Sequence, residues 1–372
     1  MRVDHEIDVA VIGAGQAGLS AAYFLRRAGV PAESGFVVLD HGERPGGAWQ
    51  HRWPLLRMGK VHGIHDLPGM ALGAVDRRLP ASEVVSAYFD RYENAFDLPV
   101  RRPVDVRSVG LTGDGRFLVR SATESWLARG VLNATGTWDK PFRPYYPGVE
   151  SFRGPQPHTV DYTGAQEFAG RRVVVVGGGT SAVQLLLEIA EVAAETTWVT
   201  RRPPVFRDAE FTPEFGRAVV AEVDRRVRGG KPPGSVSGLT GLQLTPEVRA
   251  AIREGILDRR PMFQRVTPEG VRWADGTEQR ADVILWATGF RAALDHLAPL
   301  RLREPGGGIR MDGTRVVAQP RLHLLGYGPS ASTIGANRAG RAAVRELLAQ
   351  LDRPLGPVTG GRARSTGAVD AA

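Results

Sequence analysis

Two glycine-rich turns between a strand and a helix, and two A-T-G triplets that each follow a buried strand, predict an α/β fold. The turns begin at Gly13 and Gly177, and the triplets occupy 134–136 and 287–289. Each turn with its flanking strands is typical of a Rossmann-like dinucleotide-binding domain on a parallel sheet. We therefore expect two such domains, with small antiparallel hairpins beside their sheets.

The first nucleotide-binding motif spans residues 8–40. Val9–Ile12 is a short apolar, β-branched run, which is typical of a buried parallel strand. Leu19–Ala28 has the spacing of an amphipathic helix, and Phe36–Leu39 forms a second strand that ends at Asp40. The order strand, turn, helix, strand predicts a βαβ unit.

Three glycines and one acid give this unit a nucleotide-binding character. Gly13, Gly15 and Gly18 fit G-x-G-x-x-G, which provides a tight turn, an approach for a pyrophosphate and close helix packing. The helix N-terminus favours phosphate, and Asp40, 22 positions after Gly18, can accept hydrogen bonds from ribose hydroxyls. The alternative is an ordinary βαβ turn without a nucleotide, which the complete context disfavours.

Composition excludes several classes of function. With 372 residues the chain has room for about two domains. The absence of cysteine excludes disulfides, thiolate metal sites and redox-active cysteine pairs, and the eight histidines lack zinc-site spacing, so we expect no metal. The net charge of +8 comes from arginines spread among acids, so we expect no nucleic-acid partner. No apolar run suits a membrane span or a secretory leader, so we expect a cytoplasmic protein; homo-oligomerisation stays open.

A loop rich in Arg, His, Gly and Pro follows Asp40 and precedes residue 70. Loops after a dinucleotide fold often wall the cofactor, so this loop is expected to line the pocket. Each of its polar side chains has the alternative of a solvated or structural role. The candidate pocket residues are Arg57, Lys60, His62 and His65.

Four further elements follow in order. A helix is expected over 82–96 with Ser82 as its cap, and a hairpin over 104–121 with its turn at 113–115. A buried strand over 129–134 leads to a proline- and aromatic-rich extended linker.

The second nucleotide-binding motif repeats the first with two changes. After the strand Val173–Val176, Gly177, Gly179 and Ala182 fit G-x-G-x-x-A. A helix then runs through Ala190, and the next strand covers 196–200.

The acid at the end of that strand is replaced by Arg201 and Arg202. Arginine at this position can bind a 2′-phosphate, which favours NADP(H) over NAD(H). The alternative is a pair of surface arginines in an arginine-rich chain.

The remaining elements complete both domains. Helices joined by a loop are expected over 207–261, a hairpin over 270–277, strands over 281–286 and 321–325, and a helix over 333–350 whose N-terminus faces the cofactor of the first domain.

These elements predict the domain division. The first domain comprises 1–163 and 288–352, the second comprises 164–287, and 353–372 is expected to be a disordered tail.

Three motifs resemble the flavin-containing monooxygenase family, the class B monooxygenases among the flavoproteins with two dinucleotide-binding domains. The resemblance runs from about Val9 to about Leu348. The motifs are Gly46-Gly47-Ala48-Trp49, the fingerprint F-x-G-x-x-x-H-x-x-x-Y at Phe152, Gly154, His158 and Tyr162, and Ala287-Thr288-Gly289-Phe290. Tyr162-Thr163 departs from the Trp-Pro or Trp-Asp of Baeyer–Villiger relatives and leans toward heteroatom oxygenation.

The resemblance implies an FAD- and NADPH-dependent monooxygenase. It would oxygenate a soft N or S atom of a small organic molecule with dioxygen, through a C4a-(hydro)peroxyflavin. No catalytic acid or base is required, and the candidates are Lys60, His62 and His65. The expected FAD contacts are Gly13, Gly15, Gln16, Ala17, Gly18, Asp40, Gly47, Trp49, Arg57, Thr135, Gly136 and Ile334. The expected NADP contacts are Gly177, Gly179, Thr180, Ser181, Ala182, Arg201, Arg202, Thr288 and Gly289.

Other activities stay open on the sequence. One is an NADPH-dependent flavin reductase or oxidase without oxygen transfer, another is Baeyer–Villiger-type oxygenation, and a third is a flavoprotein sensor without turnover. The disulfide-reductase branch is disfavoured because the chain has no cysteine.

Overall fold

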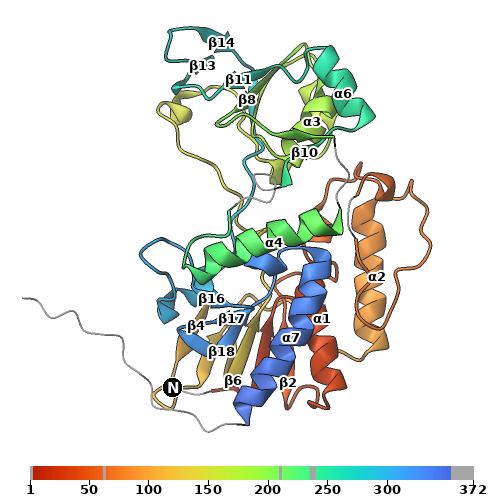
Figure 1. The fold of residues 1–372 in the computed structure, drawn as a ribbon, viewed down its shortest axis with the longest axis vertical. Helices are drawn as coiled ribbons and strands as arrows, with labels where there is room; N and C mark the ends of the chain where they lie inside the picture. Colours follow the sequence, from red (N-terminus) through yellow and green to blue (C-terminus); the bar gives the residue numbers. More distant parts are fainter. Residues whose placement is uncertain (1–2, 62–63, 209–211, 235–239, 353–372) are drawn as a thin grey trace, which may run out of the picture.

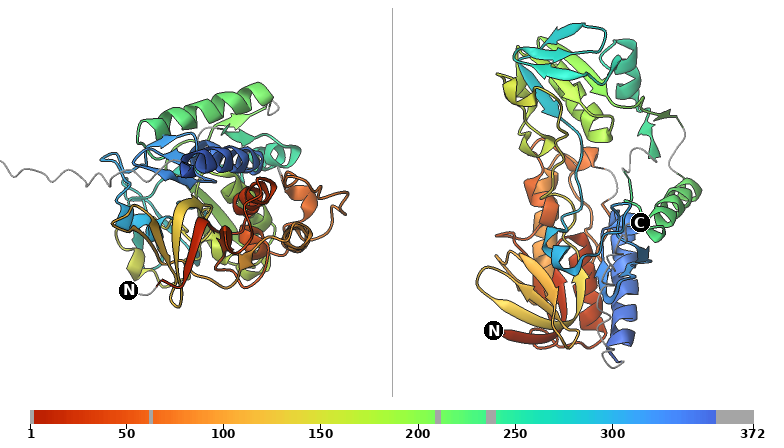
Figure 2. Two further views of the ribbon diagram at one scale, coloured as in Figure 1. Left: turned by 90° about the horizontal axis from the view of Figure 1, so that it is seen from below. Right: turned by 90° about the vertical axis from the view of Figure 1, so that its left-hand side faces the viewer.

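The computed structural model describes residues 3–61, 64–208, 212–234 and 240–352. It has two lobes stacked along the long axis, joined by extended segments at a waist (Figures 1 and 2). The lower lobe in Figure 1 contains both the first and the last part of the chain, and the upper lobe contains the middle part.

A nine-stranded sheet forms the centre of the lower lobe, and its main path runs in the order β16-β17-β18-β6-β1-β2-β3. Strands β18, β6, β1, β2 and β3 are parallel. Strands β4 and β5 form an antiparallel hairpin, and β5 pairs with the first half of β6. The strands are β1 His5–Ile12, β2 Phe36–Leu39, β3 Val100–Arg101, β4 Ser108–Leu111, β5 Phe117–Arg120, β6 Ser125–Asn133, β16 Met311–Asp312, β17 Arg315–Val316 and β18 Gln319–Leu324.

Both faces of this sheet are buried, which explains why its central strands are almost continuously apolar. Val9 and Val11 of β1 pack against three helices: α1 (Gln16–Arg27), α2 (Ala81–Ala95) and α7 (Thr333–Leu351). On the other face, Ala10 and Ile12 pack against the β4–β5 hairpin and the short helix η6 (Asp295–Leu300).

The upper lobe has a four-stranded parallel sheet in the order β11-β8-β7-β15. Helix α3 packs against this sheet, and a three-stranded antiparallel sheet of β12, β13 and β14 lies beside it. The elements of this middle part of the chain, of which all but α4 belong to the upper lobe or the waist, are β7 Arg172–Val176, α3 Thr180–Ala190, β8 Glu195–Thr200, β9 Phe206–Arg207, α4 Pro213–Arg228, β10 Leu242–Gln243, α6 Pro246–Arg253, β11 Arg259–Pro261, β12 Arg265–Thr267, β13 Gly270–Arg272, β14 Glu278–Arg280 and β15 Val283–Trp286.

Helix α4 leaves the upper lobe and packs on the lower one, where Figure 1 shows it lying across the waist. Val227 is fully buried among residues of the lower lobe, and the Nη1 of Arg228 lies 2.8 Å from Oδ1 of Asp312. Between β9 and β10 the chain therefore extends from one lobe to the other.

The remaining single turns are η1 Gly47–His51, η2 Met58–Lys60, η3 Val149–Ser151, η4 Thr159–Asp161, η5 Ala165–Phe168 and η7 Gly328–Ser330.

Most expected elements are present, with one error in capping. The hairpin turns at 113–115 and 275–276 connect antiparallel strands, as expected. Ser82 does not cap α2: the helix begins at Ala81 after Pro80, with no side-chain cap. The predicted tail, 353–372, lies outside the described residues.

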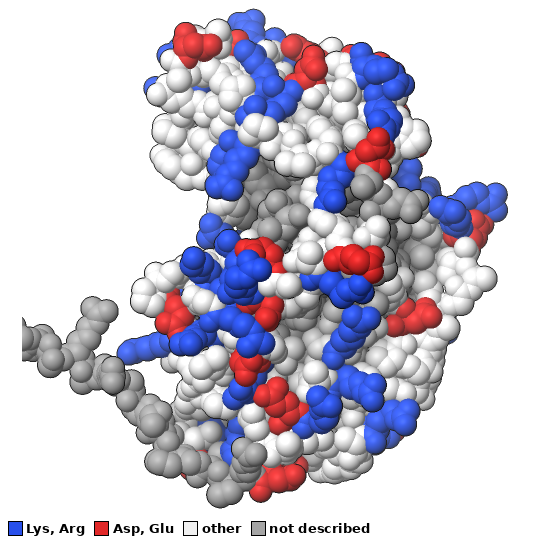
Figure 3. All heavy atoms as spheres, viewed as in Figure 1, with Lys and Arg blue, Asp and Glu red and all other residues white. Residues whose placement is uncertain are grey.

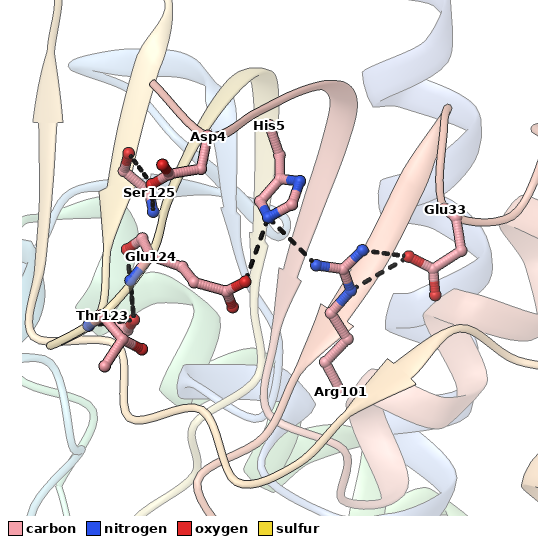
Figure 4. Close-up of polar contacts among 8 residues, drawn as sticks. Asp4, His5, Glu33, Arg101, Thr123, Glu124 and Ser125 are labelled. Atoms are coloured by element: carbon pink, nitrogen blue, oxygen red, sulfur yellow. Dashed lines mark hydrogen bonds and ion pairs between the residues drawn. The ribbon is translucent and has the colours of Figure 1, made fainter. Parts of the chain in front are cut away.

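Polar contacts tie the strands together at the amino edge of the large sheet (Figure 4). Arg101 of β3 donates two hydrogen bonds to Glu33 Oε2, at 2.6 and 3.1 Å. At the start of β1, the His5 Nε2 lies 3.3 Å from Glu124 Oε1 and 3.4 Å from Arg101 Nη1. These contacts stabilise the edge opposite the glycine-rich turn.

Among the described residues, no helix is both long enough and apolar enough to span a membrane. Figure 3 shows Lys and Arg side chains scattered with Asp and Glu over the visible face of both lobes, and a hollowed waist between them.

Candidate functional site

The first phosphate cradle is the turn between β1 and α1. Gly13 has φ +96°, and a Cβ there would lie 2.6 Å from the Ala134 carbonyl oxygen. At Gly18 a Cβ would lie 1.8 Å from the Gly13 oxygen, whereas at Gly15 it would meet nothing within 4 Å. Gly15 is also the N-cap of α1 and makes no side-chain cap, so the first N–H groups of the helix are left for a ligand. The turn fits a pyrophosphate.

Asp40, at the end of β2, is almost fully buried and already has partners. Its carboxylate accepts hydrogen bonds from the backbone N–H of Ala14 at 2.6 Å and of Gly42 at 2.9 Å. It thereby holds the glycine turn against the second strand. Since a carboxylate has about four acceptor positions, it retains capacity for ribose hydroxyls.

Two residues that the sequence reading missed support Asp40. The Nε of Arg102 lies 3.4 Å from Asp40, and its two terminal nitrogens donate to Glu93 at 2.6 and 2.7 Å. Burial raises the pKa of Glu93, while the paired guanidinium opposes that effect. A local strand pattern cannot reveal this trio, because it joins α2 and β3 across the fold.

The second cradle repeats the backbone of the first. Gly177 has φ +150°, and a Cβ there would lie 2.1 Å from the Ala287 carbonyl oxygen. Gly179 is the N-cap of α3 and again makes no side-chain cap. Thr180, Ser181 and Ala182 form the first turn of that helix, so all of the predicted residues of this motif lie together.

Arginines follow strand β8 at the position where Asp40 follows strand β2 in the first motif. Arg201 and Arg202 are exposed directly after the strand. Arg259 of β11, which the sequence reading missed, donates from Nε to Thr200 Oγ1 at 2.6 Å and from Nη2 to the Thr200 carbonyl at 3.2 Å. Three arginines therefore lie at one strand end, and two of them are exposed, which is a composition that suits a phosphate monoester.

Both cradles face the waist between the lobes. The chain leaves β6 at its carboxyl end, at Ala134, and leaves β15 at its carboxyl end, at Ala287, to cross between lobes. Because β1 is parallel to β6 and β7 is parallel to β15, the two glycine turns lie at these same edges. Thr135 and Gly136 begin one crossing, and Thr288 and Gly289 begin the other.

The two crossings are bonded to each other. The backbone N–H of Phe142 donates to the Gly289 carbonyl at 2.9 Å, and that of Ala293 donates to the Gly136 carbonyl at 2.9 Å. The hydroxyl of Thr135 donates to Ala293 O at 2.7 Å, and that of Thr288 donates to Phe142 O. The hydroxyl of Thr288, an expected NADP contact, is thus engaged by the other crossing.

The fingerprint residues stabilise this double crossing. His158 is fully buried; its Nδ1 accepts from the Val160 N–H at 3.2 Å, so its Nε2–H donates to the Gly289 carbonyl at 3.0 Å. Burial lowers the pKa of His158. Tyr162 donates to Glu188 of α3 at 2.8 Å. His158 thus positions the backbone of the second crossing, and Tyr162 positions helix α3.

The other two fingerprint residues pack beside β15. Phe152 is buried, and a Cβ at Gly154 would lie 2.3 Å from the Asp282 carbonyl oxygen. The glycine is required because the crossing passes this close to the strand.

A stack of rings lies on the double crossing. Trp138 stacks on Phe290 with 5.2 Å between ring centroids, and His158 meets Phe290 edge-on at 5.1 Å. The Arg52 guanidinium lies 4.7 Å from the Trp138 ring and 5.7 Å from the Trp49 ring. Trp49 follows Gly47, where a Cβ would lie 2.9 Å from Gly15, so the stack adjoins the first cradle.

The candidate catalytic residues do not form one cluster. Lys60 is exposed. A backbone hydrogen bond and the hydroxyl of Thr245 lower the pKa of Glu247 in α6, and the charge of Lys60 adds a smaller effect in the same direction. The side chain of His65 is exposed, and its carbonyl accepts from Gln16 Nε2 at 3.2 Å. His62 and the side chain of Ile334 lie outside the described residues. Arg57 precedes η2 and makes no side-chain bond with a described residue.

Asn337 of α7 is another residue that the sequence reading missed. It accepts from Gln16 Nε2 at 3.0 Å and donates to the Asp66 carbonyl at 2.7 Å. It joins the first turn of α1 and the loop after residue 64 to α7, which begins after the cap Ser332. Among the described residues no group of His, Asp and Glu could hold a metal ion.

Comparisons with known proteins agree with this geometry. The profile of the pyridine nucleotide-disulphide oxidoreductase family matches residues 10–228. A flavin-containing monooxygenase structure from Stenotrophomonas maltophilia is similar, with 40% identity and a TM-score of 0.78, over 93% of this chain and 99% of that one. An indole-3-pyruvate monooxygenase, YUCCA1, from Oryza sativa subsp. japonica is 27% identical over 83% of this chain and 82% of its own length.

A more distant structure shares the fold. Cyclohexanone monooxygenase in an open form has 19% identity and a TM-score of 0.62, over 94% of this chain and 88% of that one. With the match of the family profile to more than half of the chain, and with 40% identity to a solved relative, the chain belongs to the flavin-containing monooxygenase family of FAD- and NADPH-dependent oxidoreductases.

Proposed function

We propose that this protein oxygenates a soft nitrogen or sulfur atom of a small organic molecule, with FAD in the cradle of the lower lobe and NADPH in that of the upper lobe. The observation that carries the two cofactor sites is the pair of uncapped helix N-termini, at Gly15 and Gly179, whose turns face one waist. The preference for nitrogen or sulfur rests on Tyr162-Thr163. When bound, the nicotinamide supplies a hydride to the flavin, and the reduced flavin activates dioxygen.

The protein's own residues would bind the two cofactors and hold them in position. The Asp40 carboxylate, held by two backbone N–H groups and Arg102, would receive the adenine ribose of FAD. Arg201, Arg202 and Arg259 would bind the 2′-phosphate of NADPH. The bonded crossings with His158 would fix the distance between the two cradles.

The choice of NADPH has a direct test. Replacing Arg201 and Arg202 together by alanine should raise KM for NADPH at least tenfold and leave KM for NADH within about twofold, since only NADPH carries the 2′-phosphate. Replacing Arg259 by Met should also raise KM for NADPH, but by less, because part of the Arg259 guanidinium is already bonded to Thr200. An equal loss for both coenzymes would contradict the assignment.

The reaction type is tested with labelled oxygen. The holoenzyme is incubated with NADPH and ¹⁸O₂ in three parallel reactions, one each with thioanisole, trimethylamine and a cyclic ketone. Incorporation of ¹⁸O into the products is measured by mass spectrometry. We expect one labelled oxygen in the sulfoxide or N-oxide. A labelled lactone alone would favour the Baeyer–Villiger alternative, which a 28% identical Streptomyces coelicolor relative of that name keeps open.

Peroxide measurements separate the remaining alternative. If NADPH is consumed and hydrogen peroxide accounts for all of it with every substrate, the protein is a reductase or oxidase without oxygen transfer. If NADPH never bleaches the flavin, the protein has a sensor role.

A further inference from the structure

A histidine and an acid from opposite sides of the first cradle contact each other. His41 follows Asp40 at the end of β2, and Asp139 lies in the first crossing, which leaves β6. The Nε2 of His41 lies 3.4 Å from Oδ1 of Asp139. Because β1 lies between β2 and β6 in the parallel sheet, this contact joins the two segments that flank the glycine turn at Gly13.

The segment 41–51, which we name the cradle loop, packs on the glycine turn between its own two ends. A Cβ at Gly47 would lie 2.9 Å from the Cα of Gly15. At the far end of the loop, the ring of His51 stacks on that of Trp138, with 5.9 Å between ring centroids and 9° between planes. Since Trp138 directly precedes the acid that contacts the other end of the loop, the loop and the crossing enclose the first cradle.

Acids from three segments control the charge of His41. The hydrogen bond to Asp139 raises the pKa of His41, burial opposes that effect, and the charges of Asp40 and Asp105 add to it. The same hydrogen bond lowers the pKa of Asp139. The two side chains are therefore an ion pair at pH values below the raised pKa of His41, and they lose that attraction above it.

The other charged groups of this cluster keep their charge above neutral pH. Burial lowers the pKa of His51, and the charges of His41 and Arg44 lower it further, although Asp139 opposes them. His51 is therefore neutral above about pH 6.5, and Arg44 stays cationic. His41 is the group of this cluster whose charge changes between about pH 6.5 and 9.

The upper cradle has no contact of this kind. Arg201 and Arg202 are exposed after β8. In the part of the chain that the structure describes, no hydrogen bond or ion pair joins residues 201–204 to the second crossing at 287–291. The contact therefore belongs to the cradle with the buried acid and not to the cradle with the exposed arginines.

We propose that His41 and Asp139 form a clasp that keeps FAD in the first cradle and that opens when His41 loses its proton. This inference rests on the proposed function, because it takes FAD as the occupant of that cradle. A dinucleotide in the turn lies between the cradle loop and the crossing, so the contact between them has to open before the cofactor leaves. His41 and Asp139 are positioning residues, since they hold the protein closed and carry out no chemistry.

Loss of the proton from His41 should speed the release of FAD. The clasp is complete below the raised pKa of His41 and weakens as pH rises through it. Both side chains are about half exposed, so the ion pair is a modest one, and we expect release to accelerate about threefold.

Release of FAD from the oxidised holoenzyme tests the clasp without turnover. The rate is measured by flavin fluorescence after dilution, and the wild type should release FAD about threefold faster at about pH 9 than at about pH 6.5. Asp139→Asn should release FAD at the faster rate over the whole range, because His41 then lacks its acid. His41→Lys should release FAD at the slower rate over the whole range, because lysine keeps its charge to about pH 10.

Two controls separate the clasp from other effects of charge. In the double variant with His41→Lys and Asp139→Asn the lysine has no acid partner, so release should be fast; slow release would assign the effect to the lysine itself and contradict the clasp. Glu124→Gln removes the acid of a similar pair, in which His5 Nε2 lies 3.3 Å from Glu124 Oε1 at the opposite edge of the same sheet (Figure 4). It should keep the rates and the pH dependence of the wild type.

Two further outcomes overturn the inference. One is a wild-type release rate that does not change with pH, and the other is an Asp139→Asn variant that keeps the wild-type pH profile. Retained flavin absorbance and an unchanged near-ultraviolet circular dichroism spectrum show that the variants are folded. A protein that takes up no FAD at all would instead contradict the proposed function, so the two failures are distinguishable.

Discussion

The two cradles share a backbone and differ in what stands at the end of the second strand. The N–H of Gly13 donates to the Leu39 carbonyl at 2.7 Å, and that of Gly177 donates to the Val199 carbonyl at 2.9 Å. Each of these glycines also packs on the carbonyl of the alanine that opens an A-T-G triplet. The lower lobe then presents a buried acid, Asp40, and the upper lobe presents exposed arginines.

This difference indicates how one backbone design could bind two cofactors with different affinities. Asp40 lies inside the protein and is bonded to the cradle itself, which suits a cofactor that stays bound. Arg201 and Arg202 lie in solvent, where charge attracts a phosphate and releases it again. We therefore expect the lower site to retain its cofactor and the upper site to exchange its cofactor.

The largest effects are expected when a single methyl group is added to either cradle. Gly13→Ala should give a protein without bound FAD, because the Cβ would collide with the Ala134 carbonyl at positive φ. Gly177→Ala should stay yellow but lose bleaching by NADPH, because the Cβ would collide with Ala287. Flavin content and anaerobic reduction by NADPH measure the two effects.

Gly110→Ala is the control, since Gly110 lies in strand β4 and a Cβ there meets nothing within 4 Å. It should behave as the wild type in both measurements. If Gly177→Ala loses FAD while Gly13→Ala keeps it, the two cofactors are assigned to the wrong lobes.

Acid should destabilise the lower lobe more than the upper one. Burial lowers the pKa of His296 and of His323 to about 4, whereas 164–287 contains no histidine. Since the unfolded chain binds these protons near pH 6.5, the free energy of unfolding should fall as pH drops from 6.5 to 4, by up to about 3 kcal/mol for each group.

Denaturant titrations across that pH range measure this loss. His323→Leu should make the curve flatter, and His65→Leu, at an exposed position, should leave it unchanged. Equal slopes in all three proteins would show that the buried histidines do not cause the acid sensitivity.

A smaller effect is expected when Asp40 loses its charge but keeps its shape. Asp40→Asn should weaken FAD about tenfold, because an amide replaces one acceptor that meets Ala14 or Gly42, and Arg102 loses a partner. Coenzyme KM values should not change. An unchanged FAD dissociation constant would mean that Asp40 supports the turn without binding the ribose.

The smallest effect is expected from ionic strength, because salt screens exposed charges more than buried ones. Raising ionic strength should increase KM for NADPH a few-fold, since Arg201 and Arg202 are exposed, and should not release FAD. Steady-state kinetics and flavin fluorescence at increasing sodium chloride measure both. A coenzyme KM that is insensitive to salt would argue against exposed arginines at the 2′-phosphate.

The sequence predicted the parts that depend on local pattern. The two glycine turns, their helices and both hairpins follow from spacing and residue type. The contacts of Arg102 with Asp40, of Arg259 with Thr200 and of Asn337 with Gln16 could not be predicted, because they join distant segments. Ser82 misled the capping prediction because Pro80 already ends the extended segment one residue before the helix.

The most direct test of two cofactors in two cradles is an anaerobic titration of the purified yellow protein with NADPH, followed in the visible flavin band. We expect one equivalent of NADPH to bleach the wild type and the yellow Gly177→Ala variant to stay oxidised. A colourless protein that refuses added FAD, or a yellow wild type that NADPH leaves oxidised, would contradict that expectation.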